Sequence, residues 1–129
     1  MINLRGHHLV CLHFFKNGHT EEFRSKLSEI IRRVKSGEDI KIIEGADDLC
    51  HACPYLKDNV CTITENAEEE IRVMDNDALR LLNLNVGSII KWNALEEKIP
   101  QIVKYWWETY CQECEFRTIC EKEIRRYLR

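Results

Sequence analysis

The sequence predicts a mainly helical α+β fold: a single compact domain over residues 1–129, with a small two-stranded sheet and cysteine-rich metal-binding loops. Chain length is the first observation, because 129 residues suffice for one ordinary hydrophobic core and are too few for a second domain. Apolar side chains recur at helical spacing in several long segments, whereas β-branched runs are short and few. Seven cysteines are unusually many for such a chain, and they indicate metal binding.

Two short segments predict the sheet. Residues 2–5 alternate apolar and polar side chains, and residues 40–43 are mostly β-branched, so we expect two paired strands. Between them, residues 7–16 are expected to form a short helix that ends near the turn pair Asn17-Gly18.

A longer helix is expected between Thr20 and Gly37. Thr20 is a good N-cap, and the apolar residues that follow it are spaced as on one face of a helix. Gly37 then provides a helix stop. Residues 50–61 show no periodicity and are expected to form a loop.

The strongest helical periodicity lies in the middle of the chain. Thr62 and Glu65 have the spacing of a capping box and predict a helix that starts there. Its apolar face repeats at intervals of four and three residues and consists of Ala67, Ile71, Met74, Ala78 and Leu81. The acidic run from Glu68 to Glu70 is expected to face solvent.

A proline divides the expected helices of the last third. We expect a short helix after Asn93, a break at Pro100, and a second helix over residues 101–110. Residues 121–129 are expected to form a short charged helix. Residues 88–92 fit neither a helix nor a strand clearly.

Charge and composition argue against several classes of function. Nineteen Lys and Arg against 22 Asp and Glu give a net charge of −3, which argues against a strongly basic nucleic-acid binder. The chain has no apolar run long enough to span a membrane and no signal-peptide pattern, so we expect a cytoplasmic protein without membrane association. The common nucleotide-binding and hydrolase motifs are absent.

The C-terminal segment is locally basic. From Arg117 onward, five cations stand against two carboxylates. Cations near a helix C-terminus suit its dipole, and this is the simpler interpretation. The other interpretation is a docking patch for an acidic redox partner protein or for nucleic acid.

Six of the seven cysteines fall into two similar triplets. The first is Cys50-x2-Cys53-x7-Cys61, and the second is Cys111-x2-Cys114-x5-Cys120. A gap of two residues lets two thiolates of one turn reach the same metal centre, and a third thiolate just downstream nearly completes the coordination shell. Buried hydrophobic cysteines or a thioredoxin-like redox pair explain this spacing less well. We therefore expect all six to be metal ligands.

The seventh cysteine belongs to a separate group near the N-terminus. Cys11 has His7 at i−4 and His8 at i−3, and a helix would place the three near one face. We expect Cys11 to be a ligand that couples this helix to the loop at 50–61, and we retain His7 and His8 as further candidate ligands. Seven thiols cannot complete two four-cysteine sites. Either one centre has three cysteines completed by histidine, solvent or substrate, or a single centre draws on both triplets.

The residues around the thiols favour iron–sulfur over zinc. Zinc knuckles usually carry glycine soon after the second cysteine, and neither triplet has one. Cys53-Pro54 is similar to the Cys-Pro dipeptide that follows a cluster ligand in bacterial ferredoxins. We therefore expect an iron–sulfur cluster, most simply 4Fe-4S, with zinc as the alternative.

Three motifs resemble one prokaryotic family of about this length. They are Leu4-Arg5-Gly6-His7-His8-Leu9-Val10-Cys11, then Asp47-Asp48-Leu49-Cys50-His51-Ala52-Cys53-Pro54 with Cys61, and Cys111-Gln112-Glu113-Cys114-Glu115-Phe116 with Cys120. Together they resemble domain-of-unknown-function family 1284, in which we expect Trp in many relatives where this chain has Phe116. The resemblance implies iron–sulfur binding through the seven cysteines, brings in His7 and His8, and implies no substrate.

These observations predict a small metal-binding protein, an iron–sulfur protein that acts in electron transfer or as a redox accessory. The alternative is a zinc-stabilised interaction module, in which the metal closes the fold. A third possibility is an enzyme whose three-cysteine cluster leaves one iron open to substrate.

Overall fold

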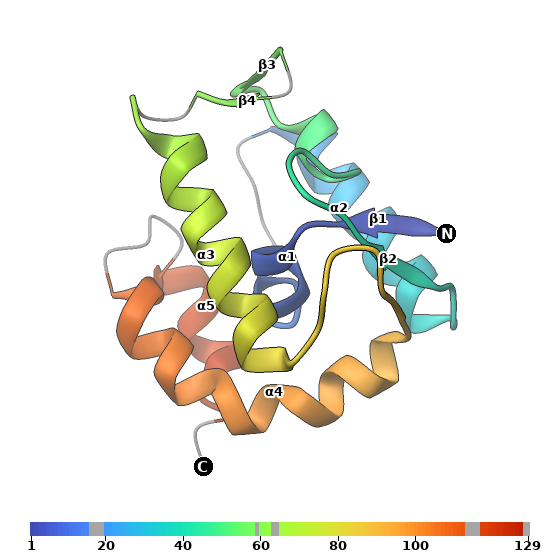
Figure 1. Cartoon of the computed structure of the whole chain (residues 1–129), viewed down its shortest axis with the longest axis vertical. Coiled ribbons are helices and arrows are strands. Elements are labelled where there is room, and N and C mark those ends of the chain that lie inside the picture. Colours follow the sequence, from blue (N-terminus) through green and yellow to red (C-terminus); the bar gives the residue numbers. More distant parts are fainter. Residues whose placement is uncertain (16–19, 59, 63–64, 113–116, 128–129) are drawn as a thin grey trace.

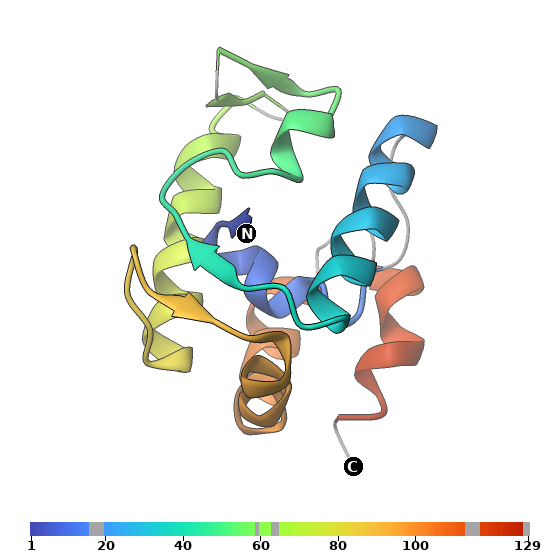
Figure 2. The ribbon, with the colours of Figure 1, turned by 90° about the vertical axis from the view of Figure 1, so that its right-hand side faces the viewer.

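Helix α1 (Gly6–Cys11) lies in the interior, surrounded by longer helices and a small sheet (Figures 1 and 2). The computed structural model describes residues 1–15, 20–58, 60–62, 65–112 and 117–127. Leu9 and Val10 of α1 are completely buried. The helix is shorter than the predicted 7–16, because the chain turns away after Cys11. The short central helix is therefore the element around which the rest packs.

The predicted strand pair is present and gains a third strand. β1 (Ile2–Leu4) pairs in parallel with β2 (Ile40–Ile42), and β5 (Ile89–Ile90) pairs antiparallel with the other edge of β2. The isoleucines and the leucine of β1 and β2 point inward and are buried, as their alternation predicts. β5 comes from the segment at 88–92 that the sequence left ambiguous. The mainly helical α+β class is confirmed.

Helix α2 (Glu21–Lys35) begins as the sequence predicts. The Thr20 hydroxyl accepts a hydrogen bond from the Phe23 amide at 3.1 Å, which makes Thr20 the N-cap. Its apolar stripe is buried. The helix ends at Lys35 with Ser36 as its C-cap, and Gly37 follows with φ +105°, a conformation that favours glycine.

The segment predicted to be a loop at 50–61 is more ordered than expected. It contains a 3-10 turn (Cys50–Ala52) and the antiparallel hairpin formed by β3 (Leu56–Lys57) and β4 (Val60–Cys61). The Thr62 hydroxyl donates to the carbonyl oxygen of Tyr55 at 2.5 Å. The capping-box prediction is therefore wrong, because the threonine that was to cap the next helix closes the hairpin.

Helix α3 (Ala67–Leu82) starts after that hairpin. Its N-cap, Asn66, makes no side-chain cap hydrogen bond. Asn83 ends the helix in the left-handed conformation with φ 57°. Gly6 of α1 approaches α3 so closely that a Cβ there would lie 2.2 Å from the carbonyl oxygen of Asp75. The α1–α3 contact therefore requires glycine.

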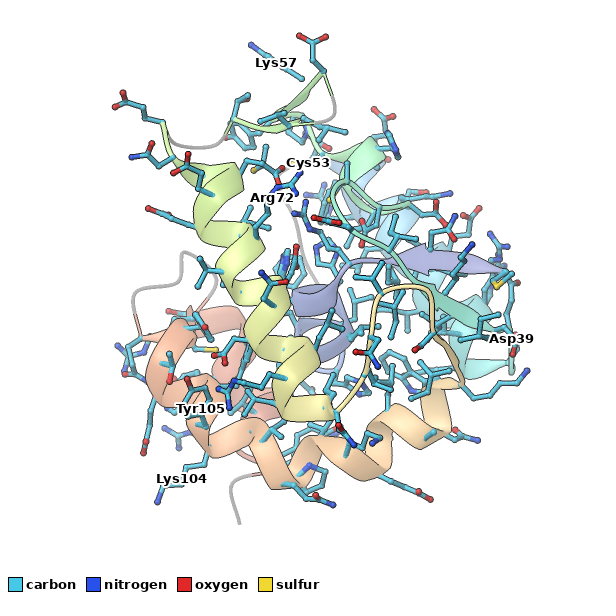
Figure 3. The ribbon with its side chains drawn as sticks, viewed as in Figure 1. Asp39, Cys53, Lys57, Arg72, Lys104 and Tyr105 are labelled. Carbon is cyan, nitrogen blue, oxygen red and sulfur yellow. The ribbon has the colours of Figure 1, made fainter. Side chains whose placement is uncertain are left out.

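Helix α4 (Trp92–Trp106) runs unbroken through Pro100, so the predicted division is wrong. Pro100 lies on the exposed side of α4, while the opposite face is buried on both sides of it. The free energy gained by burying that face is larger than the cost of the one backbone hydrogen bond that proline cannot donate. The hydroxyls of Tyr105 and Tyr110 both donate to Asp77 of α3, at 3.0 and 2.7 Å, and tie the two helices together (Tyr105 is labelled in Figure 3).

The chain then widens into a π-helical turn, η2 (Trp107–Cys111), before helix α5 (Arg117–Ile124). α5 begins four residues earlier than the predicted start at 121. Such π turns re-aim side chains and are frequent at functional sites. Here the turn ends on Cys111, which is buried. No helix in the described part of the chain is both long and apolar enough to cross a membrane.

The buried histidine in the core predicts a specific acid sensitivity. His13 is 7% exposed and stacks on Trp92 with ring centroids 3.9 Å apart. Burial lowers the pKa of His13 to about 3. The unfolded chain keeps the ordinary value of about 6.5, so it binds the proton more readily and stability falls as the pH drops from about 6.5 to about 3.

The expected loss is roughly 1 kcal/mol per pH unit over that range. Urea unfolding at a series of pH values measures it. His13→Phe keeps the stacked ring and cannot titrate, so its stability is expected to vary less steeply with pH. Equal slopes in the two proteins would contradict the assignment.

Candidate metal centre

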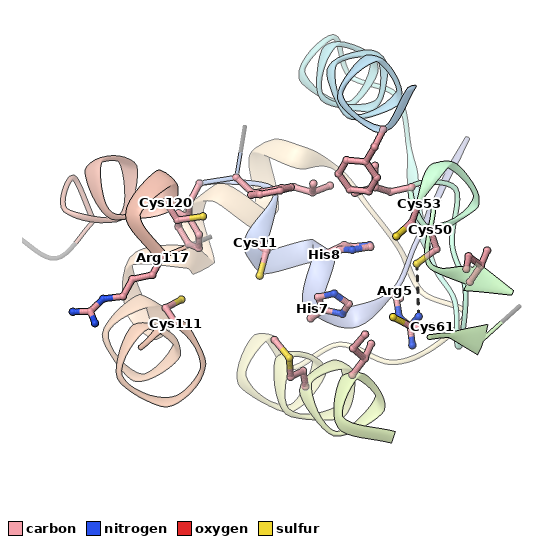
Figure 4. Close-up of a pocket in the computed structure, with 18 residues that line it drawn as sticks. Arg5, His7, His8, Cys11, Cys50, Cys53, Cys61, Cys111, Arg117 and Cys120 are labelled. Carbon is pink, nitrogen blue, oxygen red and sulfur yellow. Dashed lines mark hydrogen bonds between the residues drawn. The ribbon is translucent and has the colours of Figure 1, made fainter. Parts of the chain in front are cut away.

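A single cavity of about 250 Å³ brings the predicted ligands together. Six cysteines and both N-terminal histidines line it, together with Arg5 and mostly apolar side chains: Cys11, Cys50, Cys53, Cys61, Cys111, Cys120, His7 and His8 (Figure 4). Cys114 lies outside the described residues. No disulfide joins any two of these six cysteines. This space is larger than one metal ion requires.

The cysteines divide into two groups at opposite ends of this cavity. Figure 4 shows Cys50, Cys53 and Cys61 at one end, beside Arg5, and we call them the hairpin group. Cys11, Cys111 and Cys120 lie at the other end, and we call them the helical group. His7 and His8 lie between the groups. In this view Cys11 lies nearer the helical group than the hairpin group, and its expected role as a metal ligand stays a prediction.

Local structure explains how the hairpin group is formed. In the 3-10 turn, the Cys53 amide donates to the carbonyl oxygen of Cys50 at 2.9 Å, which folds the two-residue gap into one compact turn. Cys61 arrives from β4, opposite Leu56 across the hairpin. The Cys61 amide donates to Glu68 of α3 at 3.0 Å, which fixes this strand against the helix.

The helical group comes from the ends and middle of three helices. Cys11 is the last residue of α1, Cys111 ends the π turn and Cys120 lies within α5. Cys111 and Cys120 are each less than a tenth exposed. The π turn supplies the local geometry that points Cys111 back toward the interior.

A completely buried arginine joins the hairpin group to the framework. The Arg5 guanidinium donates to Asp75 at 2.8 Å and to Glu68 at 2.9 Å, and its Nη1 lies 3.7 Å from the Cys50 sulfur. Burial on its own would lower the pKa of Arg5, but Glu68 and Asp75 outweigh it and raise the pKa above the usual range. Arg5 is thus a permanent cation beside a thiol.

The two histidines are each held by a carboxylate through the same ring nitrogen. Nδ1 of His7 lies 2.6 Å from Asp75, and Nδ1 of His8 lies 2.5 Å from Asp47. Metal-binding histidines characteristically donate one ring N–H to a carboxylate, which fixes the tautomer and leaves the other nitrogen for the metal. In both residues Nε2 is the nitrogen that remains for a ligand.

Electrostatics at the cavity favour a neutral His7 ring and neutral Cys50 and Cys53 thiols when no cation is bound. Burial, followed by the charge of His8, lowers the pKa of His7 below its usual value. Burial and the nearby charge of Asp47 raise the pKa of the Cys50 thiol to about 12, and burial also raises that of Cys53. A metal cation bound there would take the place of the thiol proton.

Sequence reasoning missed the four residues that orient the candidate ligands. They are Arg5, Asp47, Glu68 and Asp75. Glu68 was expected to face solvent and instead is the partner of Arg5, because it lies on the side of α3 that meets the hairpin. A usable signal existed for Asp75: it occupies a position on α3 whose helical neighbours, Ile71, Ala78 and Leu82, are apolar.

The partition of cysteines leads to a prediction for Cys11. If Cys11 is a ligand of the helical group, Cys11→Ser should lower the metal content or make the centre labile to air, while the hairpin group keeps its metal. The buried hydroxyl adds a folding cost of about 1–3 kcal/mol in either case. Metal analysis before and after exposure to air measures the effect. Unchanged metal content and unchanged air stability would remove Cys11 from the site.

The fold and cavity define a small α+β domain built around buried cysteines, histidines and a charged framework. The chain belongs to the family described as protein of unknown function DUF1284, whose model matches residues 18–120. The matched range includes both cysteine triplets and begins after Arg5, His7, His8 and Cys11. No curated protein and no solved structure matches the chain.

Proposed function

We propose that this protein is an iron–sulfur protein that transfers electrons, with the cluster held in the central cavity. The observation that carries the proposal is the convergence of six cysteines from separate elements on one mostly apolar cavity. Thiolates are the characteristic ligands of iron–sulfur clusters. When bound, such a cluster supplies one-electron transfer.

The spacing of the thiols supports a cluster over a single zinc ion. Among the described residues, the one set of three potential ligand atoms lying within 4.8 Å of one another comes from His8, Asp47 and Cys50. At least one pair of the three hairpin-group sulfurs is therefore more than 4.8 Å apart. Thiolates around one tetrahedral zinc lie roughly 3.8 Å apart, given a Zn–S bond of about 2.3 Å.

The surroundings of the hairpin group supply the means to set a reduction potential. Arg5 places a buried positive charge at the Cys50 sulfur, and a cation there stabilises the more negative, reduced state. Leu49, Phe23 and Leu56 also line the cavity and keep water away from the thiols. We propose that electrons pass to a separate redox protein, and that the chain acts in a reducing cytoplasm.

A potentiometric titration of anaerobically purified protein tests this function. A visible absorption band that bleaches and returns in a one-electron step is expected. Cys53→Ser should lose or weaken the band. Ala52→Ser adds the same hydroxyl in the same turn without touching a candidate ligand, and it should leave the band unchanged. A colourless protein that unfolds on zinc chelation would favour the zinc module instead.

A further inference from the structure

The hairpin group offers three thiols to a centre that needs a fourth protein ligand or an open position. The remaining described cysteines lie at the opposite end of the cavity (Figure 4). The other potential metal ligands that line the cavity are the two histidines between the groups, His7 and His8. The following inference rests on the proposed function and concerns which residue completes that centre.

The ring of His8 is fixed at the wall of the cavity by a buried carboxylate. Nδ1 of His8 lies 2.5 Å from Oδ2 of Asp47, and Asp47 is 1% exposed. The His8 ring itself lines the cavity. Because Nδ1 is occupied by the carboxylate, Nε2 is the nitrogen with a lone pair for a cation.

The same carboxylate also fixes the first cysteine of the hairpin group. Asp47 accepts hydrogen bonds from the Cys50 amide at 2.9 Å and from the Arg5 amide at 2.8 Å. A ring nitrogen of His8, an oxygen of Asp47 and the sulfur of Cys50 all lie within 4.8 Å of one another. One buried group therefore sets the positions of His8 and Cys50 together.

We infer that His8 is the fourth protein ligand of the cluster held by Cys50, Cys53 and Cys61, with Asp47 as its positioning residue. His7 is held in the same way by Asp75, but Asp75 makes no hydrogen bond to a cysteine among the described contacts. His7 is thus the matched control. With His8 in place, no iron of this centre is left open to substrate, which argues against the enzyme alternative.

A histidine ligand has a measurable electronic consequence. Imidazole is neutral where cysteine thiolate is negative, and histidine ligation raises the potential of iron–sulfur centres relative to all-cysteine ones. His8→Cys should therefore keep the cluster and lower its midpoint potential. Asp47→Asn weakens the acceptor at Nδ1, makes the imidazole less electron-rich, and should raise the potential and alter the nitrogen coupling described below.

The deciding experiment is pulsed EPR on the reduced protein labelled with ¹⁵N-histidine and purified without oxygen. A hyperfine coupling from a histidine nitrogen is expected in the wild type and in His7→Gln, and its loss is expected in His8→Gln. If His8→Gln fails to assemble a cluster, two other results test the assignment. Retention of the coupling in His7→Gln and a lowered potential in His8→Cys support His8 as the ligand, and their absence contradicts it.

The outcomes separate the two proposals. A cluster without histidine coupling, or a coupling lost only in His7→Gln, overturns the assignment of His8 and leaves the iron–sulfur function standing. Absence of iron and sulfide from the wild type overturns both.

Discussion

Arg5→Leu is expected to lower the free energy of unfolding by about 3–5 kcal/mol, because it removes the buried cation that the buried carboxylate of Asp75 and the partly buried carboxylate of Glu68 share. Arg5 is completely buried and bonded to Asp75 and Glu68 at 2.8 and 2.9 Å. Leucine fills part of the space and supplies no positive charge. Chemical denaturation of wild type and variant, prepared with the same metal content, measures the difference.

Arg72→Leu is the matched control, because Arg72 pairs with the same Glu68, at 3.1 Å, from an exposed position. Its side chain is 46% exposed. Exposed ion pairs contribute about 0–1 kcal/mol, so the control should change stability little. Similar losses of unfolding free energy in the two variants would mean that burial does not make Arg5 contribute more to stability than Arg72.

Gly6→Ala is expected to cost about 3 kcal/mol or more, at the upper end of overpacking effects. The added Cβ would lie 2.2 Å from the carbonyl oxygen of Asp75 and 2.7 Å from its backbone carbons, which cannot rotate away. α1 must therefore move from α3, and it carries Arg5, His7 and His8 with it. The midpoint temperature of thermal unfolding and the metal content should both fall.

Gly37→Ala separates crowding from backbone strain. A Cβ at Gly37 meets nothing within 4 Å, and the only cost is its positive φ of +105°. That cost is about 1–2 kcal/mol, with no expected loss of metal. If Gly6→Ala behaved like Gly37→Ala in both measurements, the close contact of α1 with α3 would not be what positions the ligands.

Local patterns in the sequence predicted the elements whose formation depends on local interactions. The N-cap at Thr20 and the apolar stripe after it define α2. The pairing of residues 2–5 with 40–43 follows from alternation and β-branching. The break at Pro100 was wrong because burial on both sides of the proline, a tertiary effect, keeps α4 continuous. The capping box was wrong because Thr62 has a competing partner in Tyr55.

For the candidate site, the sequence predicted donor residues and not their arrangement. The spacing of Cys50 and Cys53 predicts that they lie close together, since one turn joins them. The position of Cys11 depends on how α1 packs against helices far along the chain. Hydrophobic periodicity does not predict that packing. The sequence did not show that the carboxylates of Asp47 and Asp75 hold the two histidines, because that contact joins residues about 40 and 70 positions apart.

The most direct test of the account is the iron, zinc and acid-labile sulfide content of freshly purified, anaerobically handled protein. We predict a brown protein that contains iron and sulfide in comparable amounts, and whose content falls in Cys50→Ser, Cys53→Ser and Cys61→Ser. A colourless protein with stoichiometric zinc and no sulfide would contradict it.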